Sequence, residues 1–163
     1  MILKMVKEMN SALKQKHFMA AFIDALSIVD GMSKIIYPTE NSQKRRYVDT
    51  WDNYIKINNG IDGKTAYDIR CCMMHESKLA IGSDTFDILA LVIPSEYNSI
   101  GIDSNITLGD DTKIYRLDII NFCNCVANGF DRYYAVNKTI VDEYDNEIMV
   151  FDSKDMRFLT QKM

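Results

Sequence analysis

Helical periodicity that continues almost without interruption from residue 2 to residue 36 constrains the fold of this chain more than any other feature. Within residues 2–15, apolar side chains recur every three or four positions, which places them on one face of a helix. The same spacing continues from Phe18 to Ile36 and stops at Pro38, since proline cannot continue a helix. The chain has only two prolines and seven glycines, so few positions interrupt such elements. The sequence therefore predicts helices over residues 2–15 and 18–36.

Two further helices are predicted before residue 80. Residues 43–57 place Tyr47 and Trp51 at helical spacing, after a loop that contains residues suited to capping a helix. The turn-forming sequence Asn-Asn-Gly at 58–60 ends this segment, and Asp62 or Thr65 can cap the helix that follows. Four helices joined by short loops are typical of an antiparallel bundle.

The pattern changes from helix to strand after Gly82. Residues 86–93 are rich in branched side chains and end at Pro94, which predicts a strand. Residues 100–108 predict a partner strand, so we expect a small β-hairpin element inserted at about residues 84–110. Asp110 and Asp111 lie beside a glycine, and we interpret them as turn residues.

The last third of the chain predicts a long helix and then a second hairpin. We expect the fifth helix to run from about Thr112 to Val136, and the hairpin to pair residues 140–144 with 148–151. The expected fold is therefore a single domain over residues 1–163. It is mainly α, an antiparallel helical bundle with a small β-hairpin element and a short C-terminal hairpin.

Composition narrows the possible functions. The net charge of −4 and the pI near 5.2 argue against a protein that coats nucleic acid through its overall charge, so any RNA contact must come from a local patch. The four cysteines form no C-x-x-C pair, and with only two histidines the chain lacks the ligands of a zinc site. We therefore expect no metal and no other cofactor.

The cysteines and the first nine residues indicate the cellular compartment in which the protein functions. The adjacent Cys71 and Cys72 are typical of reduced core residues, which suggests a reducing cytosol. Charges interrupt every short apolar run of residues 1–9, a pattern of an amphipathic helix rather than a signal peptide. No apolar stretch reaches the length of a membrane span. We expect a cytoplasmic protein that makes no membrane contact.

Arg70 and His75 are the candidate catalytic residues. Arginine binds phosphate through its planar fork, and histidine transfers protons near neutral pH. Together they suit cleavage of RNA, whose 2′-hydroxyl is an internal nucleophile, without a metal. Five residues of helix advance about 7.5 Å and turn about 140° beyond a full turn, so the two side chains straddle a groove rather than stack. A two-fold axis beside this helix would gather two such pairs in one cleft.

Simpler roles for the same two residues remain open. Arg70 is also placed to pair with Asp68, Glu76 or Asp87, and His75 to cap the end of its helix. Asp24 and Asp30, both in the second predicted helix, are alternatives for orienting His75 across the bundle. The sequence does not choose between them.

The segment Tyr-Asp-Ile-Arg-Cys-Cys-Met-Met-His-Glu at residues 67–76, after the helix of residues 20–26 and the basic stretch of residues 44–47, resembles HEPN domains. The resemblance covers roughly residues 15–135, and only the segment with Arg70 and His75 is specific. It implies an all-helical, usually dimeric fold and a metal-independent endoribonuclease, often a toxin or a phage-defence effector.

The resemblance also implies roles and partners. Arg70 and His75 match the R-x4-H signature of the family, and a homodimer would bring both pairs into one cleft. Cys71 departs from the Asn, Asp or His that commonly follows the arginine in strongly nucleolytic members. Catalytically silent members serve as RNA- or protein-binding and dimerisation modules, and this alternative stays open. A toxin would have an antitoxin, and a defence effector a defence partner protein.

Lys44, Arg45 and Arg46 form the chain's one run of three basic residues and are the candidate substrate-binding residues. Bound to RNA, they would contact phosphates, with Tyr47 or Trp51 offering a stacking face. A solvated helix face is the simpler interpretation of the basic run, and a core position that of Trp51. A third hypothesis is a helical protein that recognises a partner through its β edge and its tyrosine-rich surface.

Overall fold

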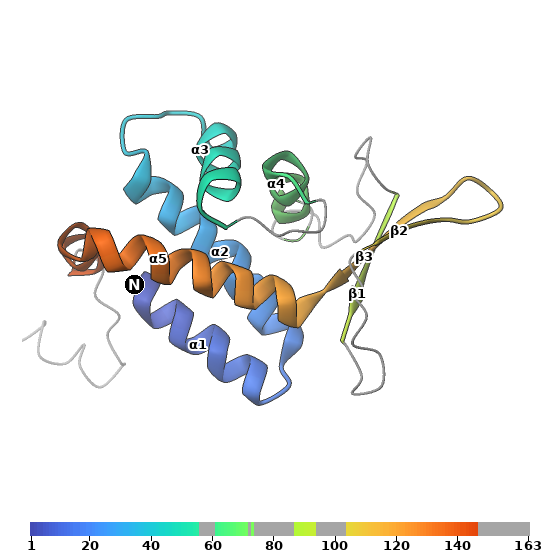
Figure 1. Cartoon of the computed structure of the whole chain (residues 1–163), viewed down its shortest axis with the longest axis horizontal. Coiled ribbons are helices and arrows are strands. Elements are labelled where there is room, and N and C mark those ends of the chain that lie inside the picture. The colour runs from blue at the N-terminus through green and yellow to red at the C-terminus, as the bar shows by residue number, and fades with distance from the viewer. Residues whose placement is uncertain (56–60, 72, 74–86, 94–103, 147–163) are drawn as a thin grey trace, which may run out of the picture.

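The computed structural model describes residues 1–55, 61–71, 73, 87–93 and 104–146. This part of the protein is mainly helical, with a small sheet at one end (Figure 1). The elements are α1 (Ile2–Lys14), α2 (Phe18–Ile36), α3 (Gln43–Thr50), a π-helical turn η1 (Trp51–Ile55), α4 (Gly63–Cys71), β1 (Ile88–Val92), β2 (Ser104–Thr107), β3 (Lys113–Asp118) and α5 (Ile119–Asn146). None of the helices described combines the length and the apolar character that a membrane crossing requires.

The predicted helices of the first half are confirmed. α1 and α2 begin and end within a residue of the expected positions, and α3 with η1 covers the described part of the third. The Oδ1 atom of Asp62 accepts a hydrogen bond of 2.8 Å from the backbone N–H of Thr65, so Asp62 is the residue that caps α4. His17 occupies the N-cap position of α2 and is exposed.

The core lies around α2, which packs against α1, α3 and α5. Phe22 of α2 is fully buried, and its ring lies 5.0 Å from that of Phe122 in α5. Trp51 contacts the same ring at 5.1 Å, so the end of α3 joins this cluster. Burial of these large apolar side chains is the main stabilising contribution.

The three strands pair in the order β1-β3-β2. β3 is parallel to β1 and antiparallel to β2, with which it forms a hairpin. Asp110 and Asp111 lie in the turn of this hairpin as expected, and Asp111 has a φ of 64°. For the described residues 104–108, the prediction that they pair with the first strand is wrong, because β2 pairs with β3, which lies between β2 and β1. Residues 100–103 lie outside the described residues.

The fifth helix begins at Ile119, and the expected start near Thr112 is wrong. Residues 113–118 alternate between sides of the sheet: Tyr115 and Leu117 are buried, while Ile114 and Arg116 are partly exposed. A two-residue period of this kind belongs to a strand. The β element therefore continues past the expected boundary near residue 110.

The C-terminal hairpin is wrong in the part that the structure describes. Residues 140–146 belong to α5, which has a non-helical φ/ψ at Asn137 and then continues. Val141 is fully buried, and the carboxylate of Asp142 binds Lys138 one turn earlier. The β-branched pair at 140–141 favoured a strand, but packing and this contact select the helix. The second predicted strand, residues 148–151, lies outside the described residues.

Cys71, Cys123 and Cys125 carry free thiols; Cys71 is half-buried rather than a core residue, and Cys72 lies outside the described residues. Cys123 is fully buried, and burial, helped by the nearby carboxylates of Asp24 and Asp118, raises the pKa of its thiol to about 12. A thiol that stays protonated at neutral pH is a weak nucleophile. Cys123 is therefore a core residue.

Candidate functional site

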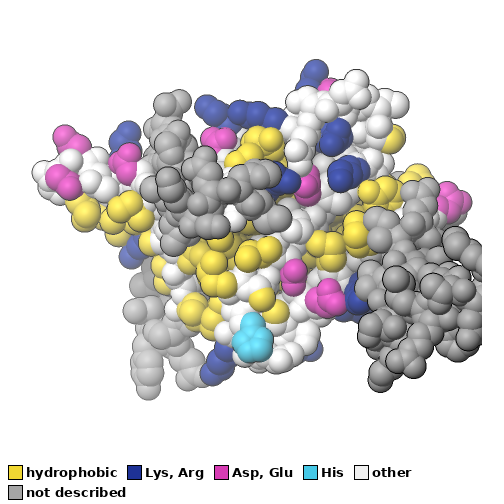
Figure 2. All heavy atoms as spheres, turned by 180° about the vertical axis from the view of Figure 1, so that it is seen from behind, with side chains coloured by type: hydrophobic (Ala, Val, Ile, Leu, Met, Phe, Trp, Pro, Cys, Tyr) yellow, Lys and Arg dark blue, Asp and Glu magenta, His cyan; other side chains and the backbone are white. Residues whose placement is uncertain are grey.

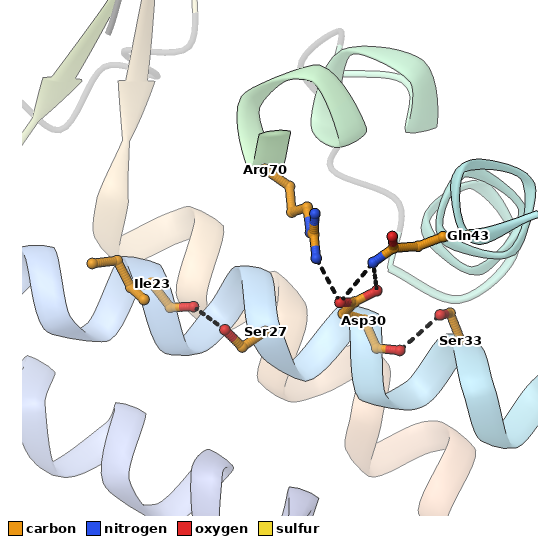
Figure 3. Close-up of polar contacts among 6 residues, drawn as sticks. All are labelled: Ile23, Ser27, Asp30, Ser33, Gln43 and Arg70. Atoms are coloured by element: carbon orange, nitrogen blue, oxygen red, sulfur yellow. Dashed lines mark hydrogen bonds and ion pairs between the residues drawn. The ribbon is translucent and has the colours of Figure 1, made fainter. Parts of the chain in front are cut away.

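Arg70 lies in the last turn of α4 and is buried, with 8% of its surface exposed. Its Nη2 atom donates a hydrogen bond of 2.9 Å to Oδ2 of Asp30 in α2, forming an ion pair (Figure 3). The sequence had suggested other carboxylates as partners of Arg70, and Asp30 only as a partner of His75. The contact joins residues 40 positions apart, and no local pattern in the sequence indicates it.

Gln43, the first residue of α3, completes this arrangement. Its Nε2 atom lies 3.1 Å from each carboxylate oxygen of Asp30 (Figure 3). The backbone carbonyl of Asp30 accepts a hydrogen bond of 2.7 Å from the Ser33 hydroxyl. Both the side chain and the backbone carbonyl of Asp30 are therefore hydrogen-bonded. Three helices therefore meet at one carboxylate, which we call the Asp30 junction: Asp30, Gln43 and Arg70.

The connection between α3 and α4 explains why Arg70 reaches this junction. The indole N–H of Trp51 donates to the Ile61 carbonyl at 3.1 Å, and Asp52 accepts from the Gly63 backbone N–H at 2.8 Å. A Cβ atom at position 63 would lie 2.5 Å from the Val48 carbonyl oxygen, so only glycine allows α4 to approach α3 so closely. The start of α4 is fixed, and Arg70 follows seven residues later.

Electrostatics at the junction keep Arg70 charged. Burial by itself would lower the pKa of the guanidinium, but the Asp30 carboxylate more than compensates and raises it. The side chains of Arg70 and Asp30 are 10% and 18% exposed, so water screens the pair only partly. A partly buried ion pair of this kind contributes little net stability, because desolvation offsets the attraction.

Tyr47 of α3 places a buried phenol close to the Asp30 junction. The side chain is fully buried, and its hydroxyl has no hydrogen-bond partner within the part of the chain that the structure describes. Burial, together with the charge of Asp30, raises the pKa of this phenol well above its usual value. Tyr47 is therefore a neutral, buried phenol near the junction, and its ring is closed to a stacking base.

His75 lies outside the described residues. Arg70 is therefore the member of the predicted catalytic pair that the structure places. The distance between the two side chains, and the roles of Asp24 and Asp30 toward His75, stay predictions.

The three basic residues of α3 have different surroundings. Arg45 pairs with the Glu40 carboxylate at 3.6 Å, and Arg46 donates to the Glu40 backbone carbonyl. Lys44 instead places its Nζ atom 5.7 Å from the centre of the Tyr67 ring in α4. Such a cation–π contact is worth about 0.5–1 kcal/mol at an exposed site. The run predicted as one binding cluster is therefore divided between two neighbours.

Three other aromatic residues, Trp51, Tyr54 and Tyr133, pack between helices. Trp51 is fully buried, as the simpler interpretation held, and does not offer a stacking face. Tyr133 is buried against Tyr54, with ring centroids 5.5 Å apart, and Arg132 donates to the Tyr54 carbonyl at 2.8 Å. These contacts join α5 to η1.

A separate apolar pocket of about 430 Å³ lies beside the start of α2. Its lining includes His17, Met19, Leu91 and Ile93, and hydrophobic side chains spread over the middle of one face of the molecule in Figure 2. Among the described residues, its lining contains no carboxylate and none of the residues of the Asp30 junction. It offers an apolar surface for contact, and Lys16 and His17 are the titratable side chains of its described lining.

No protein-family model, curated protein or solved structure matches the chain. Within the described ranges, no three His, Cys, Asp or Glu side chains are grouped so that they could hold a metal ion. The cations of the candidate site are Arg70, which binds Asp30 at the Asp30 junction, and Lys44, which lies over the ring of Tyr67.

Proposed function

We propose that this protein is a metal-independent endoribonuclease of the HEPN type, with Arg70 and His75 as its catalytic residues. The observation that carries the proposal is the ion pair of 2.9 Å between Arg70 and Asp30 at a point where three helices meet. A guanidinium held in this way is pre-oriented, and the planar, charged group suits recognition of a phosphate. The histidine required for proton transfer follows five residues later in the sequence.

The reaction is an internal transesterification. The ribose 2′-oxygen attacks phosphorus and the bond to the 5′-oxygen breaks, leaving a 2′,3′-cyclic phosphate and a 5′-hydroxyl. His75 either accepts the proton of the 2′-hydroxyl or donates one to the leaving oxygen, a role worth about 10²–10⁴-fold in rate. Arg70 stabilises the charge that develops on the phosphoryl oxygens. DNA lacks the nucleophile and is not a substrate.

The proposal extends to the assembly and its setting. A HEPN-like bundle would act as a cytoplasmic homodimer that brings both Arg70–His75 pairs into one cleft. Its biological role would be that of a toxin or phage-defence effector, held in check by an antitoxin or working with a defence partner protein. RNA is the substrate in each case.

One observation favours a second candidate, a HEPN-like binding or dimerisation module without turnover. Arg70 is 8% exposed and bound to Asp30, which suits a residue that stabilises the meeting of the helices. Cys71 follows it and offers only a weak hydrogen bond for orienting a substrate. In that case the module would bind RNA or protein and leave it intact.

The two histidines give the deciding experiment a matched control. Purified protein is incubated with a mixed RNA pool in EDTA, and wild type is compared with His75→Ala, Arg70→Ala and His17→Ala. We expect cleavage by the wild type and by His17→Ala, because His17 lies at the N-cap position of α2, in the lining of a pocket whose described residues do not include the Asp30 junction. His75→Ala and Arg70→Ala should lose at least about 10²-fold in rate. The ends of the products are tested for the 2′,3′-cyclic phosphate.

Each other result has a defined meaning. Absence of cleavage by a folded wild type would reject the ribonuclease and favour the silent module. Equal cleavage by wild type and His75→Ala would remove the Arg70–His75 pair from the reaction. Cleavage that stops in EDTA would reject the metal-independent mechanism.

A further inference from the structure

The contact between Lys44 and Tyr67 connects the basic run of α3 to the face of α4 that carries Arg70. Tyr67 and Arg70 are three residues apart in α4, so they lie on one face with Cβ atoms about 5–6 Å apart. The Nζ atom of Lys44 lies over the Tyr67 ring at 5.7 Å from its centre. Lys44 thus lies over a residue that shares a face of α4 with Arg70.

Tyr67 is itself held in place. Its ring packs edge-on against the buried Tyr47 at 5.6 Å between centroids. Burial and a hydrogen bond with Cys71 raise the pKa of the phenol, so the ring stays neutral and attracts the ammonium group. Lys44 therefore has a preferred position, which lowers the entropy lost when it binds an anion.

Among the described basic residues around the site, Lys44 and Arg46 form no ion pair with a described carboxylate. Arg70 is balanced by Asp30, and Arg45 by Glu40. Arg46 is half-buried and donates to the Glu40 backbone carbonyl, whereas Lys44 is exposed and therefore accessible to an anion. Since the whole chain carries a net charge of −4, attraction of RNA to this face depends on such local excess charge.

We propose that Lys44, seated on Tyr67, binds the RNA phosphate next to the one that contacts Arg70, and that Arg45 and Arg46 do not bind the substrate. The inference rests on the proposed function, since it concerns the same site. It also predicts recognition of the backbone rather than of the bases. Tyr47 and Trp51 are buried, and the ring of Tyr67 has Lys44 over it, so stacking on these aromatics does not select the sequence.

Binding of a non-cleavable RNA tests the inference separately from catalysis. The probe is a fluorescent, fully 2′-O-methylated single strand of about 12 nucleotides, a length within the usual site sizes. Its anisotropy is measured with wild type, Lys44→Ala, Lys44→Arg and Arg45→Ala in EDTA, between about 50 and 200 mM KCl. Arg45→Ala is the matched control, because it removes an exposed cation one residue away. Circular dichroism checks that all variants are folded.

We expect Lys44→Ala to raise Kd about fivefold and to lower the slope of log Kd against log salt by about 0.7, the loss of one phosphate contact. Lys44→Arg should restore binding, and Arg45→Ala should change Kd by less than about twofold. Strands of uridine and of adenosine should bind within about threefold of each other. Equal losses in Lys44→Ala and Arg45→Ala, or no loss in Lys44→Ala, would overturn the inference.

Failure of the inference is distinguishable from failure of the proposed function. If the wild type cleaves RNA but Lys44→Ala binds the probe as well as wild type does, the subsite is wrong and the ribonuclease stands. If binding depends on Lys44 and nothing is cleaved, the subsite belongs to a silent RNA-binding module. If the wild type fails to bind the probe at about 100 µM, weaker than ordinary non-specific binding, both are rejected.

Discussion

The two sides of α2 differ in what they bury. Toward α1 and α5, the helix presents apolar side chains such as Phe22, whose ring meets Phe122 at 5.0 Å. Toward α3 and α4, it presents Asp30, which binds Gln43 and Arg70. Two buried hydroxyls of α3, on Tyr47 and Thr50, lack a hydrogen-bond partner in the described part of the chain.

This difference separates what holds the protein together from what the site needs. Apolar burial stabilises a fold directly, whereas a buried polar group contributes little or lowers stability unless its hydrogen bonds are complete. A chain selected for stability alone would place apolar residues on both sides of α2. The Asp30 junction therefore fixes the position of Arg70 between the helices and adds little net stability.

The largest effect is expected on the apolar side. Phe22→Ala removes a fully buried ring from the core and should lower the free energy of unfolding by about 3–5 kcal/mol. Met19→Ala, on the exposed surface of the same helix, should change it by less than about 0.5 kcal/mol. Urea unfolding followed by circular dichroism measures both. Equal effects of the two substitutions would contradict the placement of the core.

The next effect tests whether the ion pair stabilises the fold. Asp30→Leu alone leaves the partly buried Arg70 without its carboxylate and should cost about 2 kcal/mol, less than for a fully buried pair. The double variant Asp30→Leu with Arg70→Met removes both charges and should come within about 1 kcal/mol of wild type. Urea midpoints give both values. A double variant as unstable as the single one would show that the pair is structural.

A smaller effect tests the unpaired hydroxyl. Tyr47→Phe removes a buried oxygen that has no partner among the described residues and keeps the ring, so stability should stay unchanged or rise by up to about 1 kcal/mol. Thermal and urea unfolding measure the change. A loss greater than about 1 kcal/mol would mean that the hydroxyl is hydrogen-bonded in solution.

The smallest effect concerns Asp24, whose pKa is raised by partial burial and, to a lesser extent, by Glu8. The folded protein holds this proton more tightly than the unfolded chain, so stability falls as the pH rises from the unfolded pKa through the folded one. Asp24→Asn removes this loss and should add about a few tenths of a kcal/mol near pH 7, and nothing near pH 3. Urea midpoints at the two pH values test the sign, and a decrease near pH 7 would contradict it.

Sequence reasoning succeeded where the deciding forces are local. The apolar spacing of residues 2–36 and the cap at Asp62 act within a few residues, and the structure confirms both. It failed at residues 113–118 and 140–146, where strand and helix patterns are both short. There, pairing of β3 between two other strands and burial of Val141 decided the outcome.

The same distinction between local forces and tertiary packing applies to the candidate site. The sequence alone determined the helices of the first half, singled out Arg70 and identified the basic run of α3, because residue type and spacing are properties of the chain itself. Only the tertiary structure decided that Arg70 binds Asp30, which Gln43 also binds, and that the contacts of Lys44 differ from those of Arg45 and Arg46. These contacts join residues as many as 40 positions apart, and they depend on how closely α4 can approach α3 at Gly63. Distances of that kind arise from packing and have no local signature in the sequence.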